Sequence, residues 1–159
     1  MQYLWMTLFG LAIVGLDQLT KYLTVQYIRP GQFISAIPGI FSLTYTQNTG
    51  AAFSFLQGQF WLFYLVTAAL AVFIIWEFPK KKMPFTMFDR WMIVAIFAGG
   101  IGNVIDRIRL NYVVDMIHVD FMDFAVFNVA DCFITCGCIA LVVHLAFFNK
   151  NFWKEEKKK

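Results

Sequence analysis

The sequence predicts an all-α membrane protein with four transmembrane helices, and three observations support this class. Of the 159 residues, 60% are hydrophobic and 14% are charged, whereas a soluble domain carries about 25% charged residues. The mean hydropathy is +0.64. Four apolar segments approach or reach the roughly 17–25 residues that a helix needs to cross a bilayer. The length suits one integral membrane domain over residues 1–159.

The first predicted span, residues 3–28, contains the charge-free stretch Tyr3–Leu16 and ends before Arg29-Pro30-Gly31, a cluster that breaks helices. A signal peptide would carry Lys or Arg ahead of its apolar region, so we expect a retained helix. Asp17 and Lys21 lie four residues apart with the acid first, which favours an ion pair on one helix face. That pair would stabilise the helix end at the interface, orient a site, or do both.

The other three predicted spans are residues 60–78, 90–108 and 127–148. In the third span, Ala98 and Gly102 have the small-xxx-small spacing that lets membrane helices approach closely. The glycines around them do not form a phosphate-binding loop, because the G-x-G-x-x-G pattern is absent and no strand precedes them.

The segment between the first two spans has strand-like composition and predicts a small β-sheet. Phe33-Ile34 and Phe41–Thr46 are the candidate strands, and Pro38-Gly39 is a turn between them. Asn48 and Gly50 suit a second tight turn, which is the interpretation that spacing favours. The alternative is that the sheet and this turn form a cradle that binds an extended peptide through main-chain hydrogen bonds.

The cations predict the orientation in the membrane. Four of the thirteen would lie at the end of the helices that carries residues 29–59 and 109–126, and nine at the opposite end. The positive-inside rule places the nine in the cytoplasm together with both termini. Because the cations occupy short flanks, they also argue against a nucleic-acid partner. The nine are Lys80, Lys81, Lys82, Arg90, Lys150, Lys154, Lys157, Lys158 and Lys159.

Two carboxyl groups lead to a functional hypothesis. Asp131 stands at the start of the apolar run Cys132–Phe148, and an ionisable residue in a membrane span indicates a functional site. Its best partner is Asp115, and no Lys or Arg lies between them in the sequence. Two adjacent carboxyls in a low-dielectric place share a proton, so one can activate water while the other polarises a carbonyl. Alternatively, Asp131 only caps its helix together with Asn128, and Asp115 is a residue of a mixed loop.

Other polar residues are weaker candidates for chemistry. Asn103 and Arg107 share one helix face, and Asp106 has arginines beside it, which makes it a poorer catalytic candidate. His118 lies near aspartates, but no H-E-x-x-H pattern is present and no metal is expected. The three cysteines lie in one apolar run without C-x-x-C spacing and are expected to be packing residues. They are Cys132, Cys136 and Cys138.

Five short motifs resemble, in the same order, the motif series of the bacterial lipoprotein signal peptidases, signal peptidase II. The resemblance covers nearly the whole chain, from the first span to the fourth, in a chain of the family's size. One departure is Met116, where the motif commonly has an aromatic residue. The motifs are Asp17–Lys21 (DQLTK), Asn48–Phe53 (NTGAAF), Gly102–Arg107 (GNVIDR), Val113–Asp115 (VVD) and Phe127–Asp131 (FNVAD).

The resemblance implies an intramembrane aspartic peptidase of the bacterial cytoplasmic membrane. It would remove signal peptides from prolipoproteins, cutting before a cysteine that carries diacylglycerol, with its site near the outer face. Asp115 and Asp131 match the catalytic pair, and no metal, cofactor or covalent intermediate is implied. The residues that match supporting or substrate-binding positions are Asp17, Lys21, Asn48, Gly50, Asn103, Arg107, Asn128 and Ala130.

The resemblance also implies that a small sheet and a short interfacial helix surround the substrate in the outer segments, 29–59 and 109–126. The partners would be the signal peptide with its diacylglyceryl-cysteine and membrane lipids, and a monomer is expected. Two other classes remain open from the residues alone. A small ion-coupled transporter would place its site near the midplane between internal repeats, and a non-enzymatic subunit would use the polar residues only for assembly.

Overall fold

The computed structural model describes residues 1–50 and 58–156. The Ala51-Ala52-Phe53 part of the second motif therefore lies outside the described residues. In chain order the elements are α1 (Gln2–Tyr27), β1 (Ile34–Ile37), β2 (Phe41–Asn48), α2 (Phe60–Lys80), α3 (Met87–Leu110), β3 (Val113–Val119), α4 (Val129–Val143), the π-helix η2 (His144–Phe148) and α5 (Lys150–Glu156).

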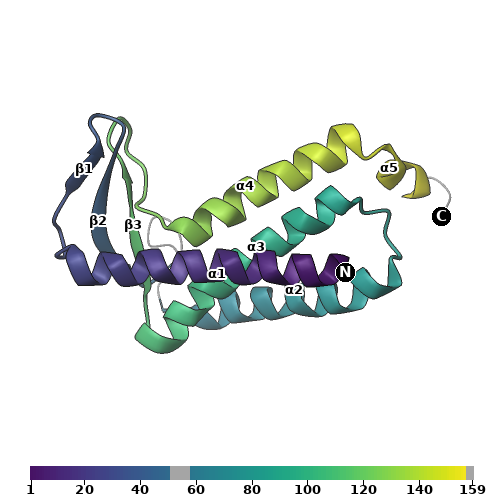
Figure 1. Cartoon of the computed structure of the whole chain (residues 1–159), viewed down its shortest axis with the longest axis horizontal. Helices are drawn as coiled ribbons and strands as arrows, with labels where there is room; N and C mark the ends of the chain where they lie inside the picture. Colours follow the sequence, from purple (N-terminus) through teal and green to yellow (C-terminus); the bar gives the residue numbers. More distant parts are fainter. Residues whose placement is uncertain (51–57, 157–159) are drawn as a thin grey trace.

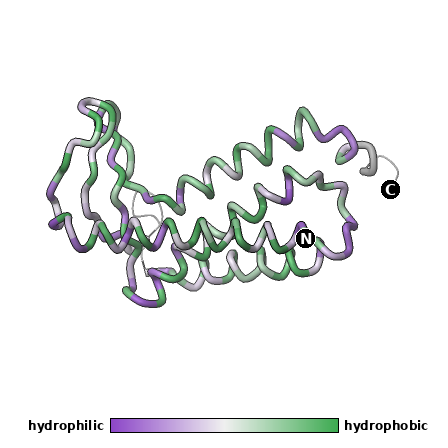
Figure 2. Tube along the Cα trace, in the orientation of Figure 1, coloured by the Kyte–Doolittle hydropathy of each residue, from purple (hydrophilic) through white to green (hydrophobic). Residues whose placement is uncertain are grey.

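Four helical segments of the described chain are long and apolar enough to cross a membrane: α1, α2, α3 and the continuous run of α4 and η2. They run along the molecule, with the sheet at one end and α5 at the other (Figure 1). Hydrophobic residues dominate these helices (Figure 2). The four predicted spans are confirmed. Helix α3 begins at Met87 rather than at residue 90, because Thr86 and Asp89 form a capping box there.

Helix α3 is the centre of the bundle and packs against α1, α2 and α4. Half of its apolar window is buried, against at most 17% for the other three spans. A Cβ atom added to Gly99 would lie 2.6 Å from the carbonyl oxygen of Ala130, and one added to Gly102 would lie 2.5 Å from Asp17 Oδ2. These glycines therefore let α4 and α1 approach α3 closely, as the small-residue spacing at Gly102 predicted.

The three strands form an antiparallel sheet in the order β1-β2-β3. β1 and β2 confirm the predicted hairpin, in which Gly39 adopts a positive φ of 72° at the turn. The interpretation of Asp115 as a residue of a mixed loop was wrong, because Val113–Val119 pairs with β2 as strand β3. Val113–Met116 are all buried, so this strand lacks the alternation that reveals a half-exposed strand.

The short interfacial helix implied by the resemblance does not occur in 29–50 or in 111–126. These described parts of the outer segments form strands, turns and irregular backbone. β3 occupies the first half of the second segment because its backbone hydrogen bonds are made to β2. Among the described residues, the short helix is α5, and it lies at the opposite end of the bundle (Figure 1).

Candidate active site

The structure brings Asp115 and Asp131 to one place from two different elements. Asp115 lies in the middle of β3, opposite Thr46, and is 1% exposed. It therefore belongs to a strand, not to the loop that the sequence predicted. Asp131 lies in the first turn of α4. Asn128 joins the two: its side-chain Nδ2 donates to Asp115 Oδ1 at 2.6 Å, and its backbone N–H donates to Asp131 Oδ2 at 3.3 Å.

The start of α4 explains the position of Asp131. Asn128 is the N-cap, and its Oδ1 accepts a hydrogen bond from the backbone N–H of Asp131 at 2.9 Å. The predicted helix cap is thus confirmed, and it coexists with the approach to Asp115. The second oxygen, Oδ1, of Asp131 accepts from Asn103 Nδ2 at 2.7 Å. A helix N-terminus also favours a negative charge by roughly 0.3–1 kcal/mol.

The pKa of Asp115 is raised from its ordinary 3.8 to about 7, chiefly by burial and then by the negative charge of Asp131. Hydrogen bonds from the amides of Asn48 and Asn128, together with the charge of Lys21, act in the opposite direction. The Asn48 amide donates to Asp115 Oδ2 at 2.9 Å. Asp115 therefore gains or loses its proton close to neutral pH.

Asn103 connects the carboxyl pair to a buried cation. Its Oδ1 accepts from Lys21 Nζ at 2.9 Å and from Asn128 Nδ2 at 3.1 Å. Because its Nδ2 is committed to Asp131, the orientation of this amide is fixed on both sides. In the described part of the chain, no Lys or Arg forms an ion pair with Asp115 or Asp131. Both carboxylates receive hydrogen bonds from amide groups instead.

Lys21 holds two further carboxylates that support the backbone of the site. Its Nζ is 2.9 Å from Asp17 Oδ2 and 3.0 Å from Asp106 Oδ2, so the predicted Asp17–Lys21 pair is confirmed. Asp17 Oδ1 accepts the backbone N–H of Ala130 at 2.9 Å, and Asp106 Oδ2 accepts that of Val114 at 3.1 Å. Each of these N–H groups belongs to the residue immediately before one of the paired aspartates. We call this arrangement of Lys21, Asp17 and Asp106 the lysine bracket.

Sequence reasoning misplaced one partner and missed one residue of this network. Asp106 pairs with Lys21 of α1, not with the arginines beside it in the sequence. Gln18 was not identified, although its Nε2 donates to Asp106 Oδ1 at 2.9 Å and to the Gly102 carbonyl at 3.2 Å. The available signal was its position three residues before Lys21, on the same face of the helix.

Arg107 ties the turn after β2 to α3. Its Nη2 donates to the Gly50 carbonyl at 3.0 Å, and its guanidinium lies 3.9 Å from the ring centroid of Phe63. The backbone N–H of Gly50 donates to Asn48 Oδ1 at 2.9 Å, so the predicted tight turn is confirmed. The same Asn48 side chain reaches Asp115 through its Nδ2. This turn therefore also orders the surroundings of the carboxyl pair.

A cavity of about 740 Å³ adjoins the pair and extends between α2, α3 and α4. At one end it is lined by polar side chains, and along the helices by apolar ones such as Leu62, Val66 and Ile134. Its volume and lining fit an apolar chain whose polar end lies beside two carboxyls. The charged and amide side chains of the lining are Asn48, Asn103, Arg107, Asp115 and Asp131.

In the described chain, the side chains of the histidine and the cysteines that the sequence singled out take no part in the hydrogen-bond network of the carboxyl pair. His118 Nδ1 is 3.2 Å from Asp120 Oδ1, and no group of three potential metal ligands occurs among the described residues. Cys132 and Cys136 line the cavity. Cys136 and Cys138 are exposed on α4 rather than packed in the bundle, which differs from the prediction of buried packing residues.

Fold and site together define a multi-pass membrane protein. At one end of its helical bundle, two carboxylates are joined by hydrogen bonds from Asn128. A model of the signal peptidase (SPase) II family matches residues 9–147. The chain belongs to the signal peptidase II family, which confirms the resemblance inferred from the motifs and makes it a membrane peptidase.

Similar proteins agree with this assignment. The chain is 48% identical over 144 residues to the lipoprotein signal peptidase of Streptococcus pyogenes serotype M2 (strain MGAS10270), covering 91% of this chain and 90% of the relative. The corresponding protein of serotype M5 (strain Manfredo) is 47% identical with the same coverage. A bacterial membrane enzyme solved by the in meso method at 2.3 Å resolution is 31% identical with a TM-score of 0.83. The match covers 92% of this chain and 90% of that structure. A second such structure, at 1.9 Å resolution, is 31% identical with a TM-score of 0.79. That match covers 90% of this chain and 93% of the structure.

Proposed function

We propose that this chain is an aspartic endopeptidase that removes signal peptides from diacylglyceryl-modified prolipoproteins, cutting before the lipidated cysteine. One observation carries the proposal: the Asn128 amide and backbone join Asp115 and Asp131 beside a long apolar cavity. Membership of a peptidase family supports hydrolysis over transport or a purely structural role. The names of the S. pyogenes relatives support a lipoprotein substrate.

The pair divides the acid and base roles between its members. Asp131 is the ionised member, because it lies at a helix N-terminus, and it removes a proton from water. The resulting hydroxide attacks the scissile carbonyl carbon while protonated Asp115 donates a hydrogen bond and then its proton to the carbonyl oxygen. Collapse of the tetrahedral intermediate breaks the C–N bond, and the leaving nitrogen takes up the proton held by Asp131. Asp115 recovers its proton at this step.

The cavity provides the binding energy for this reaction. The apolar part of the signal peptide lies between α2, α3 and α4, and the acyl chains of the diacylglyceryl group remain in the lipid. The scissile bond then lies at the polar end, where both water and the carboxyls reach it. Contacts made by remote apolar groups position the bond for attack. The sheet and the turn at Asn48 and Gly50 form the cradle on the side of the cleaved peptide.

In this proposal the chain is a single integral membrane domain that works as a monomer, with both termini in the cytoplasm. The lysines after α2 and at the start of α5 lie at the end of the bundle opposite the sheet. The positive-inside rule therefore supports a carboxyl pair near the outer face.

The decisive experiment replaces each aspartate singly with asparagine, Asp115→Asn and Asp131→Asn. Purified protein is assayed for cleavage of a diacylglyceryl-modified precursor with a chelator present. We expect each variant to lose at least about 10³-fold in kcat/KM, because residues that act as a unit fail together. Asp123→Asn, the same change at an exposed position, is the matched control and should retain wild-type activity. Full activity of Asp115→Asn or Asp131→Asn would rule out the aspartic mechanism.

A further inference from the structure

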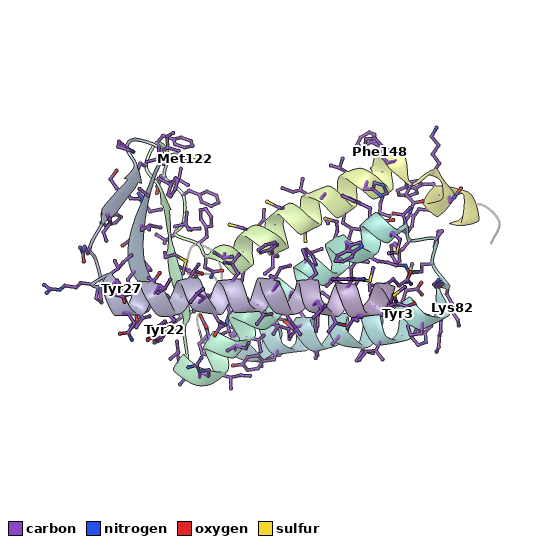
Figure 3. All side chains as sticks on the ribbon, in the orientation of Figure 1. Tyr3, Tyr22, Tyr27, Lys82, Met122 and Phe148 are labelled. Carbon is purple, nitrogen blue, oxygen red and sulfur yellow. The ribbon has the colours of Figure 1, made fainter. Side chains whose placement is uncertain are left out.

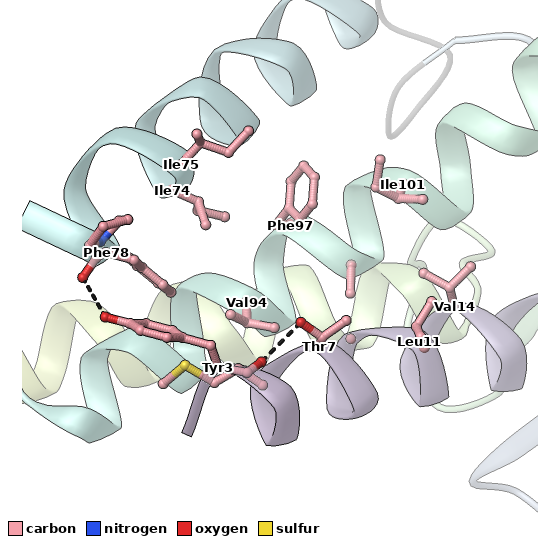
Figure 4. A pocket seen from close by; sticks show the side chains of 14 residues that line it. Tyr3, Thr7, Leu11, Val14, Ile74, Ile75, Phe78, Val94, Phe97 and Ile101 are labelled. Atoms are coloured by element: carbon pink, nitrogen blue, oxygen red, sulfur yellow. Dashed lines mark hydrogen bonds between the residues drawn. The ribbon is translucent and has the colours of Figure 1, made fainter. Parts of the chain in front are cut away.

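A second cavity lies on a different side of α3 from the carboxyl pair. It has a volume of about 490 Å³ and lies between the N-terminal half of α1, the C-terminal half of α2 and the middle of α3 (Figure 4). Leu11 and Val14 line it from α1, and Ile74 and Ile75 from α2. We call it the α1–α2 groove. It forms because α1 and α2 both pack against α3 and leave a gap between them.

Among the described residues that line the α1–α2 groove, Tyr3 and Thr7 are the ones with a side-chain hydroxyl, and the protein uses both hydroxyls as donors. Tyr3 Oη donates to the carbonyl of Phe78 at 2.7 Å, and Thr7 Oγ1 donates to the carbonyl of Tyr3 at 2.9 Å (Figure 4). Because the protein already satisfies both hydroxyls, the chemistry that fits the groove is hydrocarbon.

Three lysines follow in the sequence directly after the last residues of α2 that line the groove. Phe78 and Pro79 line the groove, and the next three residues are the exposed lysines Lys80, Lys81 and Lys82. Lys82 and Tyr3 lie at the same end of the molecule (Figure 3).

The lysines after Pro79 lack acidic partners. Lys80 Nζ and Lys82 Nζ lie 5.1 and 4.9 Å from the ring centroid of Trp76. Among the described side chains, those of residues 1–50 and 58–153, none forms an ion pair with Lys80, Lys81 or Lys82. Tryptophan and lysine together are typical of a segment at the level of the lipid headgroups.

We propose that the α1–α2 groove binds one acyl chain of an anionic phospholipid whose phosphate contacts the cluster Lys80, Lys81 and Lys82. The apolar lining recognises the chain, and three lysines without an ion pair among the described side chains favour a headgroup with a net negative charge over a zwitterionic one. The site is separate from the substrate cavity, but Phe97 lines both of them. A bound chain therefore supports the aromatic side chain that forms part of the wall of the substrate cavity.

The test measures which lipids stay on the purified full-length protein. The protein is reconstituted in bilayer discs with equal amounts of phosphatidylglycerol and phosphatidylcholine of identical acyl chains, and retained lipid is counted by native mass spectrometry. We expect several-fold more phosphatidylglycerol than phosphatidylcholine on the wild-type protein. Equal retention of the two lipids would overturn the proposal.

Two sets of variants separate the groove from the charge. Leu11→Trp fills the groove and should reduce retained phosphatidylglycerol several-fold, whereas Leu8→Trp, on the same helix but outside the lining, should not. The triple change Lys80→Gln/Lys81→Gln/Lys82→Gln should abolish the preference for phosphatidylglycerol. The same loss of charge at Lys150, Lys154 and Lys157 should leave it intact.

Two outcomes contradict the site even if phosphatidylglycerol is preferred. Unchanged retention by Leu11→Trp would place the lipid outside the groove, and equal effects of both triple changes would indicate bulk charge alone. Thermal unfolding and precursor cleavage verify that each variant folds. If Leu11→Trp does not fold, Ile75→Trp fills the same groove from α2 at a residue that is 74% exposed.

Discussion

Both ends of the helical bundle bury carboxylates, but they compensate them differently. At the α5 end, Asp89 Oδ1 lies 2.7 Å from His144 Nδ1, and its Oδ2 accepts from Asn149 Nδ2 at 2.9 Å and from the backbone N–H of Thr86 at 2.7 Å. Glu77 is likewise 3.9 Å from Arg90 Nη2. Both of these buried acids have a basic side chain beside them, and their contacts join the end of α2, the start of α3 and the start of η2.

At the sheet end, the same compensation applies to Asp17 and Asp106, which share Lys21. Asp115 and Asp131 differ, since their nearest donors in the described chain are neutral amides and they line a cavity. A buried carboxyl that forms no ion pair keeps its proton more easily, which is what acid–base chemistry at neutral pH needs. Burial alone therefore does not distinguish Asp115 and Asp131 from the other buried acids, whereas burial beside a cavity without an ion pair among the described side chains does.

The largest effect on stability is expected from Lys21→Met in the lysine bracket. It leaves Asp17 and Asp106 buried without a cation, and breaking a buried pair in this way costs about 3–5 kcal/mol. The folded fraction should also lose precursor cleavage. Without Lys21, the carboxylates of Asp17 and Asp106 are no longer held in place, and these accept the backbone N–H groups of Ala130 and Val114 next to the carboxyl pair. Thermal unfolding and kcat/KM measure the two effects.

The counterpart at the α5 end is Arg90→Met, which removes the cation beside Glu77. Its ion pair is longer, so we expect a smaller loss of stability and unchanged cleavage per folded molecule. Wild-type cleavage by folded Lys21→Met would show that the lysine bracket does not position the site.

The next largest effect is expected at the two helix caps. Asn128→Ala and Thr86→Ala each remove the N-cap of a capping box, α4 at the sheet end and α3 at the α5 end. Both should lower the free energy of unfolding by about 1 kcal/mol. Only Asn128→Ala should also lower kcat/KM, by about 10²-fold. Asn128 holds Asp115 by a hydrogen bond, and a small displacement of a reacting group costs about that factor. Equal activity of the two variants would separate helix capping from catalysis.

A third prediction concerns pH. The pKa of Asp115 is raised to about 7, and Asp115 must be protonated to donate to the carbonyl, so kcat/KM should fall as the pH rises above about 7. The hydrogen bond from Asn48 lowers this pKa. Asn48→Ala should therefore shift the alkaline limb of the pH–rate profile to higher pH, whereas His144→Ala at the α5 end should leave it in place. An unshifted limb in Asn48→Ala would contradict the role assigned to Asp115.

The same group makes stability depend on pH. Its pKa is raised above the ordinary value of 3.8, so the folded chain holds a proton that the unfolded chain releases between about pH 4 and pH 7. The free energy of unfolding contributed by this group should consequently decrease as the pH rises through that window. Asp115→Asn should abolish the decrease, which denaturant titrations at several pH values would measure.

The smallest effect on activity is expected from His144→Ala. His144 lies at the start of η2 and contacts Asp89, so its removal should destabilise the protein by about 1–3 kcal/mol through loss of a buried partner. Cleavage per folded molecule should not change. A large loss of kcat in this variant would mean that the α5 end is coupled to the carboxyl pair, which the comparison of the two ends does not predict.

The sequence alone determined the four spans, because hydropathy is a local property that a single helix reveals by its length and composition. It also determined the hairpin of β1 and β2, since turn residues and strand composition lie side by side. Its motifs carried the family and the candidate pair, Asp115 and Asp131. Strand β3 escaped detection because its pairing partner is remote in sequence and its first residues are buried on both faces.

Only the tertiary structure decided which acids are neutralised. The cation of Asp106 comes from Lys21 in α1, and the amide that joins Asp115 to Asp131 comes from Asn128. Gln18 and the α1–α2 groove also arise only where helices pack against each other. Charge compensation depends on distances between elements, and those distances are set by how closely the glycines of α3 let α1 and α4 approach.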